Sequence, residues 1–380
     1  MAGIYIHIPF CLRKCSYCDF VSIPYDEETV SAYMESLEKE MEQFFSGEAL
    51  GLPPRTLYIG GGTPSLLSPS SFLHFMESLC RFVPILSLEE VTLEANPGTL
   101  NPEKLSCYRK SGVSRISIGA QSFHEETLRT LGRIHTVRDI HESFNFSKDA
   151  SIQNISLDIM FGTPGQSVKG AMEDLSLATS LSPSHISLYA LSVEEGTPLH
   201  DEVSRGLKVP SGDECGETYY SAIRFLENCG YRHYEISNFA REGCICLHNK
   251  GYWSGEEYVA FGAGASGYIR NDQGEGMVRY RNHPDVRSYI QSISLGESPR
   301  TQVETIDSTG SWRERLIMGL RMIEGICLDE IEESFGPTPP EVQCSVNRLI
   351  EEGKLTLEGR RILVPERFLF TSNEILSYLV

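Results

Sequence analysis

The sequence predicts an α/β fold: a partial (β/α)6, TIM-like barrel followed by a smaller C-terminal α+β domain with a winged-helix-like module. Short apolar runs alternate six times with amphipathic stretches over residues 1–230. Parallel strands need crossover helices, so this alternation implies a parallel sheet. Six units fit an open barrel better than a closed eight-stranded one. We expect three regions: the core at 1–230, an irregular connecting region at 231–310 and the C-terminal module at 311–380.

Each expected strand is rich in β-branched or aromatic residues, and most of them end at Gly, Pro or Asn. The expected strands are Ile4–Ile8, Leu57–Ile59, Val91–Glu94, Arg115–Ile118, Ile155–Ile159 and Ile186–Leu191. Between them, apolar residues recur at helical spacing. The expected helices are Glu27–Phe45, Pro69–Phe82, Pro102–Ser111, Val137–Ala150, Val168–Leu181 and Asp213–Cys229.

Residues 231–310 are less regular, with clusters of Tyr, Gly and Asn. The C-terminal module is expected to hold three helices, one from Ser311, one at Asp329–Phe335 and one at Pro340–Glu352, followed by a short hairpin at Leu355–Leu357 and Ile362–Val364. A winged-helix-like pattern suggests DNA binding, but the last of these helices carries several glutamates against Arg348 alone. Because phosphate contact needs a basic face, we favour a structural or partner-docking role.

Charge and composition narrow the class of protein. The formal net charge is −19, from 52 acidic and 33 basic residues, which argues against general nucleic-acid binding. The sequence shows neither a signal-peptide pattern nor an apolar run long enough to cross a membrane. We therefore expect a cytosolic protein, in which clustered cysteines are more often metal ligands than disulfides.

Polar and glycine residues stand where the predicted strands end. They are Cys11, Gly60–Thr63, Glu94, Gln121 and Asp158, on five consecutive strands. Ligands of parallel α/β sheets gather at the carboxyl ends of the strands. The sequence therefore predicts one binding site at that rim.

Cys11, Cys15 and Cys18 place three thiols within eight residues. A 4Fe–4S cluster usually takes four thiolates, so three leave one iron open for S-adenosylmethionine (SAM). The alternative is a structural zinc site, but zinc usually takes four protein ligands, and no fourth one is adjacent. The glycine run that follows the second predicted strand favours the cluster, because glycines let a backbone approach a ligand closely.

Several motifs together resemble the oxygen-independent coproporphyrinogen III oxidase family of radical SAM proteins. They are YIHIPFC at 5–11, GGGTP at 60–64, EANP at 94–97, SIGAQSF at 117–123, LGRIH at 131–135 and LDIMFGTPGQ at 157–166. The resemblance implies a radical SAM barrel whose three cysteines hold a 4Fe–4S cluster. It also implies the residues that contact SAM, namely Tyr5, Gly61, Gly62, Thr63, Glu94, Gln121, Arg133 and Asp158.

The family has an oxidase branch and a haem chaperone branch. The oxidase branch carries a fourth cysteine where this chain has Phe20, and a long segment before the cluster where this chain has ten residues. The chaperone branch (HemW) resembles the chain at Phe20 and at HNKGYW, residues 248–253. That motif implies a haem contact by His248, with Tyr252 and Trp253 packing on the porphyrin.

The resemblance therefore implies a haem chaperone that carries a 4Fe–4S cluster, SAM and haem. It would pass haem to acceptor proteins, such as respiratory enzymes. The alternatives are the coproporphyrinogen III dehydrogenase and a radical SAM enzyme that acts on another substrate. Cys244 and Cys246 could bind a metal together with His248 or supply a second haem contact, but we favour coincidence for this spacing.

Overall fold

Six parallel strands lie side by side in the same order as along the chain. The computed structural model describes residues 2–47, 53–271 and 276–380. The six strands are β1 (Ala2–Ile8), β4 (Pro54–Gly61), β5 (Glu90–Ala95), β6 (Arg115–Gln121), β7 (Asn154–Phe161) and β8 (His185–Ala190). Each pairs in parallel with the next, and each overlaps a strand that the sequence predicts.

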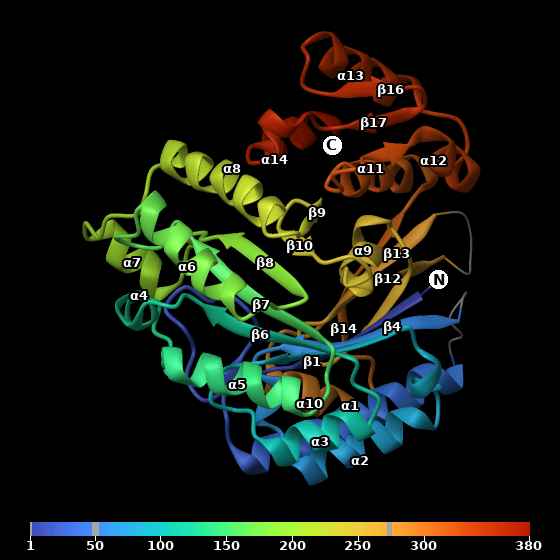
Figure 1. Cartoon of the computed structure of the whole chain (residues 1–380). Coiled ribbons are helices and arrows are strands. Elements are labelled where there is room, and N and C mark those ends of the chain that lie inside the picture. Colours follow the sequence, from blue (N-terminus) through green and yellow to red (C-terminus); the bar gives the residue numbers. More distant parts are fainter. Residues whose placement is uncertain (1, 48–52, 272–275) are drawn as a thin grey trace.

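Helices connect these strands, and α1, α2, α3 and α5 lie along the lower side of the molecule in Figure 1. Side chains of Ser, Thr or Asn accept a backbone N–H bond at the start of α2, α3, α5, α6 and α8, which satisfies a donor that the helix leaves free. The helices are α1 (Glu27–Gly47), α2 (Pro69–Cys80), α3 (Pro102–Lys110), α5 (Val137–Asp149), α6 (Val168–Ser180) and α8 (Gly212–Asn228). The shorter α4 (Glu125–Thr130) and α7 (Pro198–Ser204) were not predicted.

The barrel is open, because other strands occupy both edges of the six. On one side β11 pairs in parallel with β1, and on the other β10 pairs antiparallel with β8. The sheet therefore runs through twelve strands. The added strands are β9 (Arg232–Glu235), β10 (Asn238–Ala240), β11 (Tyr258–Phe261), β12 (Ser266–Arg270), β13 (Met277–Asn282) and β14 (Arg300–Ile306).

This continuation of the sheet differs from the irregular connection that the sequence predicts for 231–310. Several of these strands are short, and the longer β13 and β14 carry many polar residues, so their apolar alternation is weak and pairing with the existing sheet decides their structure. Two helices also lie in the region, α9 (Leu247–Trp253) and α10 (Val286–Ser294). Residues 272–275 of the region lie outside the described residues.

The C-terminal module holds α11 (Ser308–Gly319), α12 (Leu328–Phe335) and α13 (Pro340–Glu351), followed by the hairpin β16 (Thr356–Glu358) and β17 (Arg361–Leu363). This order agrees with the winged-helix-like pattern. The sequence missed β15 (Ile326–Cys327), which pairs with β17 and completes a three-stranded sheet. A last helix, α14 (Ser372–Leu376), follows the hairpin.

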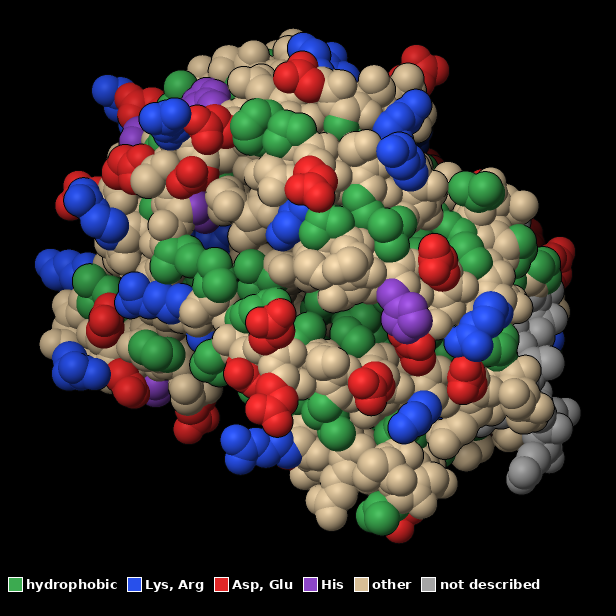
Figure 2. Space-filling view, turned by 90° about the horizontal axis from the view of Figure 1, so that it is seen from below, with side chains coloured by type: hydrophobic (Ala, Val, Ile, Leu, Met, Phe, Trp, Pro, Cys, Tyr) green, Lys and Arg blue, Asp and Glu red, His purple; other side chains and the backbone are tan. Residues whose placement is uncertain are grey.

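On the face in Figure 2 acidic and basic side chains are interspersed, with small hydrophobic groups between them. None of the helices in the described part of the chain combines the length and the apolar character that crossing a bilayer requires.

Candidate functional site

A loop after β1 brings the three cysteines of the triplet to one cavity. The short strands β2 (Phe10–Cys11) and β3 (Ile23–Pro24) pair in parallel and close this loop at its base. Cys11, Cys15 and Cys18 are free thiols, and all three line a cavity of ≈ 320 Å³ at the carboxyl ends of the strands.

The donor set fits a 4Fe–4S cluster. In such a cluster each thiolate binds a different iron, so three cysteines leave one iron open. Thr63 Oγ1 donates to Cys11 Sγ at 3.6 Å, and Arg133 Nη1 donates to Cys15 Sγ at 3.5 Å. Both donors point at a sulfur that would ligate the cluster. A zinc ion would need ligands that converge on one point, and no group of three or more His, Cys, Asp or Glu does so within the described residues.

The glycine run after β4 forms another wall of the cavity. Gly61 has φ +110°, and a Cβ on it would lie 2.5 Å from His7 Cε1. A Cβ on Gly62 would lie 2.7 Å from the carbonyl oxygen of Phe10. Neither position tolerates a side chain, so backbone groups and Thr63 face the cavity here.

Glu94 at the end of β5 is held by two donors. The hydroxyl of Tyr58 donates to Oε1 at 2.7 Å, and the N–H of Gly61 donates to Oε2 at 2.9 Å. Burial raises the pKa of Glu94 to about 7, and the nearby Asp158 adds to the rise against the effect of both hydrogen bonds. The cavity therefore holds a carboxyl group whose charge depends on what binds beside it.

Asp158, Gln121 and Arg133 also line the cavity. Asp158 accepts hydrogen bonds from Ser117 Oγ at 3.0 and 3.1 Å, and its burial raises its pKa. Gln121 has φ +66°, an uncommon conformation for a residue other than glycine. Arg133 Nη2 donates at 2.6 Å both to Asn96 Oδ1 and to the carbonyl of Gly119.

Acidic and basic groups thus line the same polar cavity. Barrel interiors are usually filled by branched aliphatic side chains. Here, by contrast, every second residue of β6 lines the cavity: Arg115, Ser117, Gly119 and Gln121. An interior of this kind suits a small ligand that carries charges of both signs.

Sequence reasoning missed several residues that line the cavity. They include Tyr58, Asn96, Arg115, Ser117, Ser187 and Tyr189. Polar residues at alternate positions of a predicted strand are the signal that could have found most of them.

Two of the predicted site residues do not line the cavity in the described part of the chain. The hydroxyl of Tyr5 lies 3.0 Å from His7 Nδ1, and the ring of Tyr5 stacks on Tyr58 rather than facing the cavity. His248 is only 2 % exposed. Its Nδ1 lies 2.8 Å from Thr56 Oγ1 and its Nε2 lies 2.8 Å from the hydroxyl of Tyr252. Both ring nitrogens are engaged within the chain, and the haem contact expected of His248 stays a prediction.

Cys244, Cys246 and His248 also have separate surroundings. The buried Cys246 donates from Sγ to Glu90 Oε1 at 3.5 Å, and Cys244 is partly exposed. The nitrogens of His248 face Thr56 and Tyr252 instead. The structure therefore does not bring these three residues together as ligands of one ion.

Comparison with known proteins decides the family. The chain is 35% identical over 364 residues to "Heme chaperone HemW" of Lactococcus lactis, covering 96% of this chain and 91% of that protein. It is 37% identical over 339 residues to the protein of the same name of Bacillus subtilis, covering 88% and 87%. The chain belongs to the HemW family.

Further comparisons agree with membership of the HemW family. Residues 5–178 match the Radical SAM superfamily, and residues 306–367 match the HemN C-terminal domain. The solved structure of coproporphyrinogen III oxidase (HemN) from Escherichia coli has a TM-score of 0.83 and covers 100% of this chain and 89% of that chain. At 20% identity this likeness shows the radical SAM fold alone. Membership implies a 4Fe–4S cluster and SAM, and the donor set of the cavity fits both.

Proposed function

We propose that the protein is a haem chaperone that binds haem, carries a 4Fe–4S cluster with SAM, and passes the haem to acceptor proteins. The observation that carries the proposal is the identity of 35% and 37% to relatives named as haem chaperones, over most of both chains. Phe20 also supports the proposal, because the oxidase branch of the family has a fourth cysteine at this position. The proposal includes a cytoplasmic location and respiratory enzymes among the acceptors.

In this proposal Cys11, Cys15 and Cys18 hold the cluster. Gly61, Gly62 and Thr63 face the amino and carboxylate end of SAM, because they expose backbone groups where a side chain would clash. The remaining SAM contacts are Glu94, Gln121, Arg133 and Asp158. Tyr5 contributes to the site indirectly, through the packing of its ring on Tyr58.

The charges of the cavity suit this ligand. SAM combines a positive sulfonium and amino group with a carboxylate, so it needs acidic partners together with a cation. Glu94 and Asp158 provide the first, and the guanidinium of Arg133 provides the second. When bound together, cluster and SAM supply a one-electron cleavage of the sulfonium; the chain itself binds and orients the ligand.

We also propose the division of the chain into a core at 1–230, a connecting region at 231–310 and a C-terminal module at 311–380. The match of residues 306–367 to the HemN C-terminal domain supports the last boundary. The connecting region continues the sheet of the core, so the division concerns role rather than separate folding.

The test uses the full chain with its cluster reconstituted under anaerobic conditions. Haem is titrated while its absorbance is followed, and 5′-deoxyadenosine is measured with coproporphyrinogen III present. We expect saturable haem binding and no turnover of the porphyrinogen. Turnover without stable haem binding would instead identify an oxidase.

The control for the cluster is a matched cysteine substitution. Cys15→Ser should remove the cluster, seen as loss of iron and of its visible absorbance, because it removes one of three thiolates. Cys80→Ser should leave both unchanged, since Cys80 is exposed on α2 and does not line the cavity. An intact cluster in Cys15→Ser contradicts the assignment of ligands.

A further inference from the structure

Two rings that do not line the cavity, those of Tyr5 and His248, pack against Tyr58, which does. The ring of Tyr58 packs against Tyr5, with ring centres 6.1 Å apart and planes at 30°, and against His248, with ring centres 5.1 Å apart and planes at 29°. Tyr5 and Tyr58 are neighbours in the register of β1 and β4, whereas His248 comes from α9. Because both rings pack against Tyr58, they restrict its side chain where its hydroxyl donates to Glu94.

His248 is itself held tightly. Besides its bonds to Thr56 and Tyr252, it packs against Gly3, where an added Cβ would lie 3.1 Å from His248 Cε1. Burial lowers the pKa of His248 to about 3, so the ring is neutral. A neutral imidazole has one donor and one acceptor nitrogen, which matches two hydroxyl partners.

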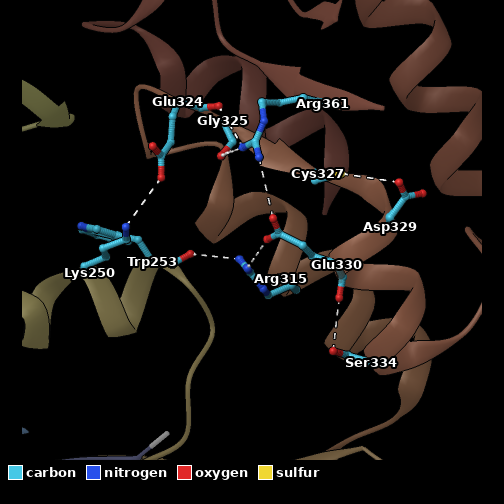
Figure 3. A network of polar contacts seen from close by, with 10 residues as sticks. All are labelled: Lys250, Trp253, Arg315, Glu324, Gly325, Cys327, Asp329, Glu330, Ser334 and Arg361. Carbon is cyan, nitrogen blue, oxygen red and sulfur yellow. Dashed lines mark hydrogen bonds and ion pairs between the residues drawn. The ribbon is translucent and has the colours of Figure 1, made fainter. Parts of the chain in front are cut away.

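Polar contacts hold helix α9 in place at both of its ends. At its start the N–H groups of Leu247 and His248 each donate to the carboxylate of Glu90 at 3.1 Å. At its other end the carbonyl of Trp253 accepts from Arg315 Nη1 at 3.3 Å, and Lys250 Nζ lies 3.7 Å from Glu324 Oε1 (Figure 3). The first contact joins α9 to β5 and the second joins it to the C-terminal module.

We propose that His248 is a positioning residue of the cavity: by stacking on Tyr58 it fixes the hydroxyl that orients the Glu94 carboxylate toward SAM. The proposal rests on the SAM site proposed above and needs no haem contact. The proposal places the HNKGYW segment at the floor of the barrel. His248 itself does not line the cavity, but its neighbours Asn249 and Cys246 do.

The test measures two quantities on each variant of the reconstituted full chain. One is the dissociation constant of SAM, from equilibrium dialysis, and the other is the position and stoichiometry of the haem absorbance. For His248→Ala we expect SAM affinity to fall about tenfold, as for the loss of one well-placed hydrogen bond, with an unchanged haem spectrum. Loss of the haem band with unchanged SAM affinity would overturn the proposal.

His233→Ala is the matched control. His233 is also buried, its Nε2 lies 3.3 Å from the carbonyl of Ile236 and it stacks on Phe239, but it does not line the cavity or touch Tyr58. We expect unchanged SAM affinity in this variant. A fall equal to that in His248→Ala would mean that any buried histidine has this effect, and would refute the positioning role.

A double variant tests whether His248 acts through Tyr58. In Tyr58→Phe the bond to Glu94 is gone, so adding His248→Ala should weaken SAM binding by less than about twofold more, since coupled residues are not additive. Full additivity contradicts the proposal. Should His248→Ala not fold, Tyr252→Phe removes only one partner of the imidazole and should weaken SAM binding in the same direction.

The two proposals fail in different ways. Wild-type protein that binds SAM but no haem refutes the haem chaperone and leaves the role of His248 standing. Protein that binds haem but shows the same SAM affinity with and without His248 refutes the positioning role alone.

Discussion

At the scale of single residues, the protonation state of Glu94 governs how the cavity binds a charged ligand. Its two hydrogen-bond donors fix its orientation, while burial and Asp158 raise its pKa to about 7. A cationic ligand favours the ionised carboxylate. The affinity for SAM should therefore increase as the pH rises through this value.

We predict this increase between about pH 6 and about pH 8, measured as the dissociation constant of SAM on the anaerobic protein. Glu94→Gln should bind SAM more weakly and with a flatter pH dependence. Glu235→Gln is the control, because burial also raises the pKa of Glu235 to about 7 but the residue does not line the cavity. A full pH response in Glu94→Gln would show that another group titrates.

The cysteine triplet and the glycine run could be predicted from the sequence, because the residues of each motif lie close together in the chain. The sequence carried no signal for the role of Tyr58, because the position of this side chain depends on the pleat of β4 and on contact with His248. That histidine bonds to Thr56, which lies 192 residues earlier in the chain. The role expected for His248 came from its motif alone. Only the packing of α9 against β1 and β4 reveals that both its nitrogens are engaged.

At the scale of elements, Glu40 joins α1 to the connecting region. Its carboxylate accepts from Tyr289 at 2.6 Å, from the N–H of Gly262 at 2.8 Å and from Asn282 at 2.6 Å. Burial raises the pKa of Glu40 from 4.5 to about 7. Folding therefore favours the protonated form of Glu40. The stability that this protonated carboxyl contributes is lost as the pH rises through about 7.

Glu40→Ala should lower the free energy of unfolding by about 3 kcal/mol, because it leaves three buried donors unpaired. Glu40→Gln should mainly remove the part of the pH dependence that lies between 4.5 and about 7. Denaturant unfolding measures both effects. Glu35→Ala, exposed on the same helix, should change stability by less than about 0.5 kcal/mol, and an equal loss there would contradict a specific role for Glu40.

The elements that the sequence predicted are those with strong periodicity, namely the six barrel strands and their long helices. The strands β9 to β14 escaped prediction because they are short or, as in β13 and β14, largely polar, and because they depend on an existing sheet edge. Helix α9 has seven residues, too few for an amphipathic pattern to stand out.

At the scale of the whole molecule, the C-terminal module shares one hydrophobic core with the barrel. Phe370 joins them, with its ring centre 6.3 Å from Phe161 on β7 and 5.5 Å from Tyr219 on α8. The hydroxyl of Tyr220 also donates to the carbonyl of Arg367 at 2.7 Å. The module is therefore expected to unfold with the barrel.

Calorimetry should show one unfolding transition for the full chain. Phe370→Ala should lower its midpoint, with a loss of about 2 kcal/mol, less than for a fully buried phenylalanine. Leu357→Ala, an exposed position in the same module, should leave the midpoint nearly unchanged. Two separate transitions in the wild-type protein would contradict a shared core.

The carboxylate of Glu90 at the start of α9 has a consequence for how the molecule can be observed. A helix of seven residues is too short to persist by itself, so its order depends on the strand that carries Glu90. The amide protons of Leu247 and His248, which bond to that carboxylate, should exchange with solvent only when this part of the barrel opens. Their exchange rates would therefore report the free energy of opening the barrel around its ligand, without any added probe.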